Sequence, residues 1–119
     1  MNITIKNILD SKEALERLAV EKLPVRTSYN LGKFLKAVNK ELEIFNEFRN
    51  ELLNKYGERQ EDNTYKIDSG NIQKFNDEVI ELINIEVHFD FELLLLDSLG
   101  NVSISSQDML ALDYLIKES

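Results

Sequence analysis

The sequence predicts an α+β fold that is mainly helical, with a long helix packed antiparallel on a second helix and two to four short strands beside them. An apolar stripe spaced alternately four and three residues apart from Leu31 to Tyr56 indicates the long helix. A shorter helical pattern runs from Ile72 to Ile83. Strict alternation of apolar and charged residues from Ile85 to Glu92 is typical of a half-buried strand. With 119 residues, the chain is expected to form a single domain, 1–119.

The first segment is expected to hold a short strand followed by a helix. Ile3 and Ile5 alternate with polar residues, as in a strand. Asp10 and Glu13 have the spacing of a capping box, and apolar residues at helical spacing follow them. Pro24 ends this region, because proline disfavours helix in the residue before it and lacks the backbone N–H group.

The long helix is the dominant feature. Thr27 or Ser28 is expected to cap it, and Gly57 stands where a left-handed C-cap is expected. From Ser28 to Tyr56 such a helix would be roughly 43 Å long, whereas a globule of this size is only about 35 Å across. The helix therefore either spans the molecule and projects, or bends near Gly32.

A projecting apolar stripe needs a partner, either the later helix or a second subunit. The pattern therefore predicts a homo-oligomer. The residues expected to support self-association are Leu35, Leu42, Phe45 and Leu52.

The rest of the chain supplies shorter elements. The polar interval 58–71 is expected to be a loop or a short hairpin, and Ser69 or Asp68 to cap the helix after it. Alternation at 102–104 suggests another short strand. Ser105, with an aspartate three residues later, resembles the capping box of a closing Leu-rich helix.

The net charge of −8 is unevenly distributed. Residues 1–60 carry 11 Lys and Arg against 9 Asp and Glu, whereas residues 61–119 carry 3 against 13. No acidic residue lies between Glu21 and Glu41. Such a chain either docks one half on the other or presents oppositely charged surfaces to partners.

The predicted strand raises the question of a metal or acid–base site. Glu86, His88, Asp90 and Glu92 would share one of its faces. The chain has one histidine and no cysteine, too few for the usual zinc or non-haem iron sites. No GxSxG turn or glycine-rich phosphate loop is present. The row is therefore expected to be a solvated or partner-facing surface, and the protein to have no cofactor, no metal and no enzymatic activity.

The acidic half is instead expected to bind a protein partner. The predicted partner-binding residues are Asp77, Glu78, Glu81, Glu86, His88, Asp90 and Glu92. Nucleic-acid binding by the basic segment with Lys33, Lys36 and Lys40 is not expected, given the overall acidity and the absence of a recognised motif. The alternative that the acidic half mimics nucleic acid and so blocks a basic protein rests on the same attraction between opposite charges, and the sequence leaves it open.

The sequence predicts a cytoplasmic protein without membrane contact. The amino terminus lacks the apolar core of a signal peptide, and no segment approaches the roughly 20 apolar residues of a spanning helix.

Two segments carry a resemblance to a known group of proteins. LPVRTSYNLGKFLKAVNKELEIFNEFRNELLNKYGE, from Leu23 to Glu58, and GNVSISSQDMLALDYLI, from Gly100 to Ile116, resemble small uncharacterised proteins of phages and prophages of Gram-positive bacteria. The resemblance implies a viral setting in a bacterial host cell and supplies no catalytic residue. We therefore expect an acidic phage accessory protein that binds a protein partner, for example a host defence or regulatory factor that it inhibits. The alternative is a virion- or tail-assembly chaperone or structural accessory protein, whose contact is the apolar stripe.

Overall fold

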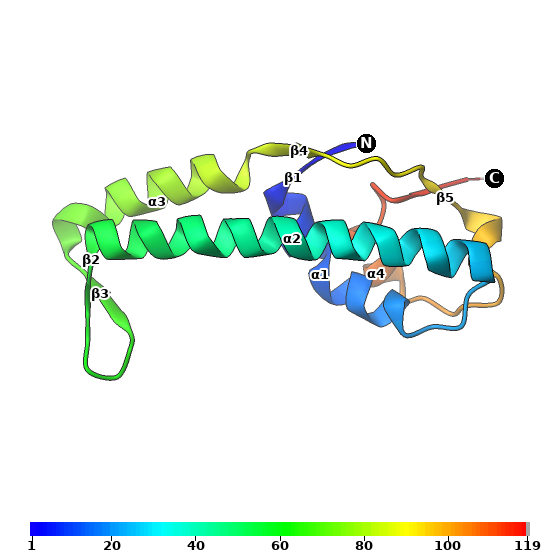
Figure 1. Cartoon of the computed structure of the whole chain (residues 1–119), viewed down its shortest axis with the longest axis horizontal. Coiled ribbons are helices and arrows are strands. Elements are labelled where there is room, and N and C mark those ends of the chain that lie inside the picture. The colour runs from blue at the N-terminus through cyan, green and yellow to red at the C-terminus, as the bar shows by residue number, and fades with distance from the viewer. Residues whose placement is uncertain (119) are drawn as a thin grey trace.

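The computed structural model describes residues 1–118 and shows an elongated molecule (Figure 1). Its principal extents are 51 × 28 × 24 Å and its Cα radius of gyration is 17.5 Å. The fold class is confirmed: the protein is mainly helical, and a long helix packs on a second one beside short strands. Six short strands form three two-stranded pairs in the described residues, more than the two to four expected.

The long helix, α2 (Val25–Tyr56), is continuous over 32 residues and spans the whole molecule. At about 1.5 Å per residue it is about 48 Å long, so it projects beyond the core and is not broken at Gly32. The expected cap at Thr27 or Ser28 is wrong. Pro24 holds the N-cap position with an extended ψ of 146°, and the Thr27 hydroxyl instead donates to the Ser98 carbonyl oxygen at 3.0 Å.

The expected left-handed cap at Gly57 is also wrong. Gly57 has an extended conformation, with φ −111° and ψ 166°, and begins strand β2 (Gly57–Arg59). A Cβ atom there would lie 2.8 Å from the Leu53 carbonyl oxygen. Glycine is therefore needed at this position for a close approach of backbone and not for a positive φ.

The first helix starts earlier than the sequence pattern suggests. Strand β1 (Asn2–Thr4) leads directly into α1 (Ile5–Ala19), and the Thr4 hydroxyl accepts the Asn7 backbone N–H at 3.1 Å as the N-cap. Asp10 thus lies inside the helix, and the expected strand position of Ile5 is wrong. Ile3 and Ile5 have the spacing of a strand, whereas Ile5 and Ile8, three residues apart and both buried, have the spacing of one helix face.

The buried core lies at one end of the molecule. There α1 and the segment after β4 pack on the first half of α2, and the short helix α4 (Ser106–Ala111) packs on α1 (Figure 1). The core side chains are Ile3, Ile8, Ala14, Leu15, Leu18, Leu31, Phe34, Val38, Leu42, Phe89, Leu94, Leu99, Leu112 and Leu115.

The other end is a thin distal arm, which we define as residues 43–83. It consists of the second half of α2, the hairpin of β2 and β3 (Tyr65–Ile67), and α3 (Ser69–Ile83), which lies along α2. The hairpin confirms one of the two expectations for the interval 58–71. No residue of α3 is fully buried. The arm therefore has a two-helix contact but no closed core of its own.

The remaining strands hold the core end together. β4 (Glu86–His88) pairs antiparallel with β1, with Ile3 opposite Val87. β5 (Leu94–Leu95) pairs parallel with β6 (Ile116–Lys117), and a 3₁₀ helix, η1 (Leu96–Leu99), follows β5. The strand expected at 102–104 is wrong, because these residues form no ladder and their apolar side chains pack on the core from an irregular segment.

The capping of α4 is confirmed. The Asp108 backbone N–H donates to the Ser105 hydroxyl oxygen at 3.1 Å. The helix is shorter than its apolar pattern suggests and ends at Ala111, since the following residues turn back to pair with β5. Leu112 and Leu115 are fully buried in that turn, so apolar spacing there reflects core packing and not a longer helix.

Candidate functional site

The strand expected from Ile85 to Glu92 is shorter than its alternation suggests: only β4, Glu86–His88, is a strand, and residues 89–92 continue from it without strand structure, with their polar side chains outward. Glu86, His88, Asp90 and Glu92 are all exposed. Between them Phe89 is buried, and the rings of Phe89 and Phe91 stack on Phe34 of α2, with centroid distances of 5.3 and 4.6 Å. The apolar half of the pattern thus attaches the segment to α2, and the charged half faces solvent.

The polar side chains of this row do not converge on a metal or catalytic centre. His88 is 65% exposed; its Nδ1 lies 2.8 Å from the Asn2 side-chain oxygen and its Nε2 lies 3.2 Å from Asp90 Oδ1. Within residues 1–118, no group of three or more histidine, aspartate and glutamate side chains could hold a metal ion. These two contacts orient the His88 imidazole at the surface, between Asn2 of β1 and Asp90.

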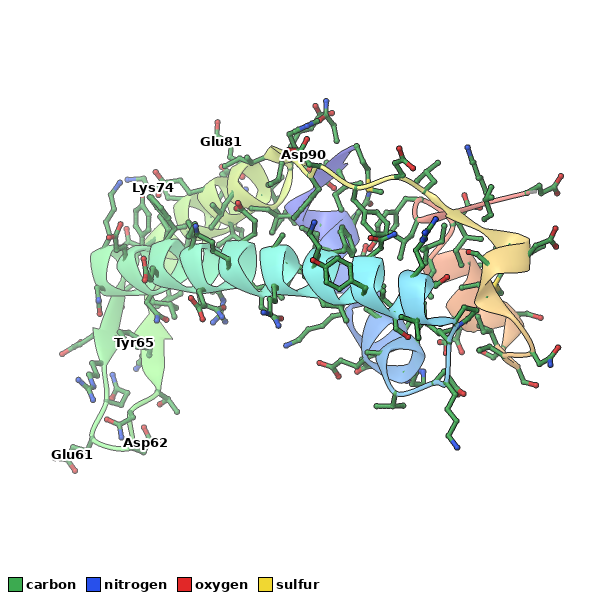
Figure 2. The ribbon with its side chains drawn as sticks, turned by 45° about the vertical axis from the view of Figure 1, so that its right-hand side comes forward. Glu61, Asp62, Tyr65, Lys74, Glu81 and Asp90 are labelled. Carbon is green, nitrogen blue, oxygen red and sulfur yellow. The ribbon has the colours of Figure 1, made fainter. Side chains whose placement is uncertain are left out.

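The acidic residues of α3 continue the row along the length of the molecule. Asp77 and Glu81 are exposed, and Asp77 accepts a hydrogen bond from the Gln73 amide at 2.8 Å. Glu81 and Asp90 lie along the same long edge of the molecule in Figure 2. Glu78 differs from the others, because it is half-buried against α2 and pairs with Lys55 at 3.4 Å.

We define the acidic edge as the exposed carboxylates on α3, on β4 and in the segment after β4. Its members are Asp77, Glu81, Glu86, Asp90 and Glu92. Between Phe75 and Ile116 the sequence contains no lysine or arginine. In the part of the chain that the structure describes, Asp90 pairs with His88, and the other four make no ion pair within 4.0 Å.

One end of the acidic edge approaches the basic start of α2. Asp90 and Glu92 line a pocket of about 760 Å³ together with Arg26, Lys33 and Lys117. This end of the edge is partly compensated by charges of the same chain. At the α3 end, Glu78 pairs with Lys55, and α3 itself carries one lysine, Lys74, beside the edge carboxylates Asp77 and Glu81.

The residues expected to support self-association lie mostly inside the protomer. Leu42 and Phe45 are buried, 8% and 7% exposed, and Leu35 and Leu52 are half-buried. These side chains form the inner face of α2 against the rest of the chain. A second copy would have to bind elsewhere on the helix.

Sequence reasoning missed an apolar groove between α2 and α3 in the distal arm. It has a volume of about 590 Å³ and is open to solvent along one side of the helix pair. Phe48 and Ile85 in its wall are 51% and 49% exposed. Its other lining residues are Glu51, Leu52, Lys55, Glu78, Glu81 and Leu82.

A second missed feature is the side of α2 that faces away from the core. We call it the outer face of α2, and all its members are exposed: Lys33, Lys36, Ala37, Lys40, Ile44, Glu47, Phe48 and Glu51. Phe48 and Glu51 also line the groove, so the face and the groove meet at these two residues. The face is basic before Glu41 and acidic after it. The absence of acidic residues between Glu21 and Glu41 was the sequence signal for the basic half of this face. The structure adds that the face lies opposite the apolar stripe of α2.

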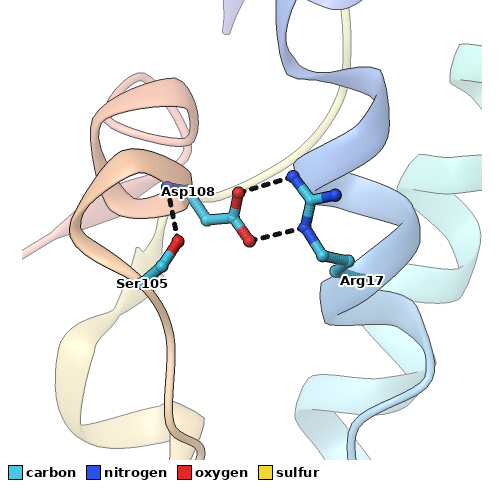
Figure 3. Close-up of polar contacts among 3 residues, drawn as sticks. All are labelled: Arg17, Ser105 and Asp108. Atoms are coloured by element: carbon cyan, nitrogen blue, oxygen red, sulfur yellow. Dashed lines mark hydrogen bonds and ion pairs between the residues drawn. The ribbon is translucent and has the colours of Figure 1, made fainter.

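Two polar contacts fasten the closing segment onto α1. The Arg17 Nε and Nη2 atoms donate to the two Asp108 carboxylate oxygens at 2.7 and 2.6 Å (Figure 3). The fully buried Ser11 Oγ lies 2.7 Å from the Tyr114 hydroxyl and also donates to the Asn7 carbonyl oxygen. Both contacts are fully accounted for by the fold and need no ligand.

Comparisons with protein-family models, with curated proteins and with solved structures give no match. Within residues 1–118, no helix combines the length and the apolar character that crossing a membrane requires.

Proposed function

We propose that this chain is a non-enzymatic accessory protein whose acidic edge binds a basic surface of another protein. The observation that carries the proposal is the set of exposed carboxylates between Asp77 and Glu92, of which Glu81 and Asp90 lie along one edge of the molecule (Figure 2), with Lys74 as the one lysine of α3. Such a predominantly negative surface accelerates encounter with an oppositely charged partner. The polar residues of the edge are spread out and exposed, which suits electrostatic docking better than chemistry at a reacting bond.

The proposed setting is the cytoplasm of a bacterial host during phage or prophage expression. The similarity of the segments 23–58 and 100–116 to small phage proteins of Gram-positive bacteria motivates it. In this setting the partner would be a basic or helical surface of a host defence or regulatory factor. Binding would inhibit that factor by covering the surface.

The test is partner capture by matched charge variants. In the edge variant, Asp77→Lys, Glu86→Lys and Asp90→Lys reverse three exposed carboxylates that do not line the groove of the distal arm, and they leave the Glu78–Lys55 pair intact. The control, Glu16→Lys, Glu58→Lys and Glu61→Lys, makes the same change in net charge at exposed positions away from the edge. Host-cell lysate is passed over each immobilised protein, and association rates are measured for the partner that the wild type captures.

The proposal expects capture by the wild type and the control and loss of capture by the edge variant. Association should also slow as salt rises, because attraction between exposed charges is screened beyond about 8–10 Å at physiological ionic strength. Equal capture by all three proteins, with association rates that do not depend on salt, would contradict the acidic edge as the binding surface.

The second candidate, an assembly chaperone or structural accessory protein, is favoured by one specific observation, the open groove of the distal arm. Glutamates 51, 78 and 81 rim its apolar floor, so the occupant it suits is an amphipathic helix with basic residues beside its apolar stripe. Ile85→Asn would then abolish capture. That result combined with normal capture by the edge variant would move the function to the groove.

A second copy of the chain belongs among the proposed partners as well. The binding face for it is not the inner stripe, because Leu42 and Phe45 are occupied within the protomer. The exposed outer face of α2 is the surface that remains along this helix.

A further inference from the structure

We infer that the outer face of α2 binds the same face of a second copy in an antiparallel orientation, so that the protein is a two-fold symmetric dimer. The inference deepens the proposed protein-binding role and rests on the self-association included in it. It identifies the partner, the contact residues and the relative direction of the two helices.

The first step is the spacing of the outer face. Its residues follow one another at intervals of three and four along α2, from Lys33 to Glu51, so they lie on one side of the helix. All of them are exposed, although the chain folds two other helices against the opposite side of α2. In Figure 1 no other element crosses in front of α2 along its length.

The second step is the division of charge along this face. Its first half carries Lys33, Lys36 and Lys40, and its second half carries Glu47 and Glu51, with Glu43 at its margin. Two antiparallel copies related by an axis at the level of Leu42 bring together residues whose numbers add up to about 84. Three charge pairs result on each side of the axis: Lys33 with Glu51, Lys36 with Glu47, and Lys40 with Glu43.

The same alignment also pairs the apolar residues of the face. Phe48, which is 51% exposed, comes opposite the small Ala37 of the second copy, so a large side chain meets a site with room for it. Ile44, 40% exposed, lies close to the axis and is covered by the aliphatic stem of Lys40. Burial of these side chains supplies the apolar contribution that exposed ion pairs alone lack.

The two helices overlap along most of their length. With the axis at Leu42, residues 28–56 of the two copies face each other over about 43 Å, and a strip about 10 Å wide buries roughly 430 Å² per copy, or roughly 860 Å² in total, which is the size of a weak interface. A parallel dimer is disfavoured, since it would place lysine against lysine and glutamate against glutamate. Charge thus selects the antiparallel direction.

Charge exchange between two variants tests the pairing. The basic half is made acidic in Lys33→Glu/Lys36→Glu, and the acidic half is made basic in Glu47→Lys/Glu51→Lys. A matched control for the first variant is Lys12→Glu/Lys66→Glu, which makes the same charge change at exposed positions outside the face. Sedimentation equilibrium measures the mass of each protein at low salt, and circular dichroism checks its helix content.

The inference expects a wild-type dimer with twice the 13.8 kDa chain mass, and an unchanged dimer for the control. Each charge variant alone should dissociate at least tenfold more readily, because two of the three facing pairs on each side of the axis then have the same sign. An equimolar mixture of the two variants should associate again as a heterodimer. Failure of the mixture to associate would overturn the pairing, as would a monomeric wild type across the micromolar range.

A spin label reports the direction of the helices. The label is attached to a cysteine introduced as Asn50→Cys, an exposed position beside the face in a chain without native cysteine. In the antiparallel dimer the two labelled positions are separated by about 16 residues, or about 24 Å along the axis, whereas a parallel dimer brings them side by side. A short distance between labels would therefore overturn the antiparallel arrangement.

These measurements are independent of the partner-capture test. If the wild type is monomeric but the edge variant loses capture, the dimer is wrong and the proposed function stands. In the opposite case, the wild type is a dimer and the two charge variants form a heterodimer, but capture does not depend on the acidic edge. The proposed function is then wrong and the dimer stands.

Discussion

Arg17 and Asp108, 91 positions apart in the chain, form a bidentate ion pair between α1 and α4. Both Asp108 oxygens accept from the guanidinium, while the Asp108 backbone N–H donates to Ser105. One residue thus fastens α4 to α1 and also completes the first turn of α4. The short closing helix is held in place by this contact in addition to its apolar residues.

Asp108→Asn should lower the thermal stability at neutral pH and lose this effect in strong acid. Hydrogen bonds from Arg17 hold the pKa of the Asp108 carboxyl below its ordinary value, so its stabilising contribution is present above the unfolded-state pKa of about 3.9. The contribution is lost as the pH falls through the lowered folded-state pKa. Melting curves of both proteins from neutral to strongly acidic pH measure this, and a constant difference between them would contradict the pairing.

Ser11→Ala should destabilise the protein by about 1–3 kcal/mol, because it leaves the Tyr114 hydroxyl without its partner at a buried site. The control is Ser28→Ala, which removes an exposed hydroxyl and should have little effect. Urea unfolding followed by circular dichroism gives both free energies. Equal values for the two variants would show that the Ser11 contact contributes nothing.

Tyr114 should ionise at a higher pH than is ordinary for a tyrosine. Burial raises its pKa above the ordinary value of about 10, and the hydrogen bond with Ser11 opposes this in part. Because the folded state favours the neutral phenol, the contribution of Tyr114 to stability is complete below the unfolded-state pKa and is lost as the pH rises through the folded-state pKa. Phenolate absorbance during alkaline titration should therefore lose a step above the ordinary tyrosine range in Tyr114→Phe.

Backbone amides of α3 should exchange with solvent faster than those of α1. The two helices have the same length of 15 residues, but α1 buries six side chains and α3 buries none completely. Local opening costs less free energy where fewer apolar contacts are broken. Hydrogen exchange followed by mass spectrometry or NMR compares them directly, and equal protection would contradict the open arrangement of the arm.

Chelation should leave the stability unchanged. The carboxylates of the acidic edge follow one another along a strand and a helix and do not meet at one point, which gives a cation few shared ligands. Thermal unfolding with and without chelator should coincide. A loss of stability that one added metal restores would contradict this prediction.

Periodicity predicted the elements that bury one continuous face. The stripe of α2, the pairing of α3 with it and the alternation around β4 follow directly from the spacing of apolar residues. Ends of elements were harder to predict, because several residues satisfy two patterns. Ile5 suits a strand or a helix, and Thr4 caps the helix without any signal stronger than that of Asp10.

The surfaces could be predicted in part. The outward position of Glu86, His88, Asp90 and Glu92 follows from the period of two. The burial of Leu42 and Phe45 depends on which elements close over α2, and that is a property of the tertiary fold. The same holds for the groove of the distal arm, whose two walls come from helices separated by the hairpin.

A single uninterrupted helix connects the core to the distal arm, and this makes the number of residues in α2 a geometric constraint. Each residue added to the helix moves the arm by about 1.5 Å and turns it by about 100° around the helix axis. Deleting one residue between the core and the groove would therefore swing α3 and the hairpin to another side of the molecule while leaving the amino-acid composition almost unchanged. The length of α2 therefore sets both the distance and the relative rotation between the surfaces at its two ends.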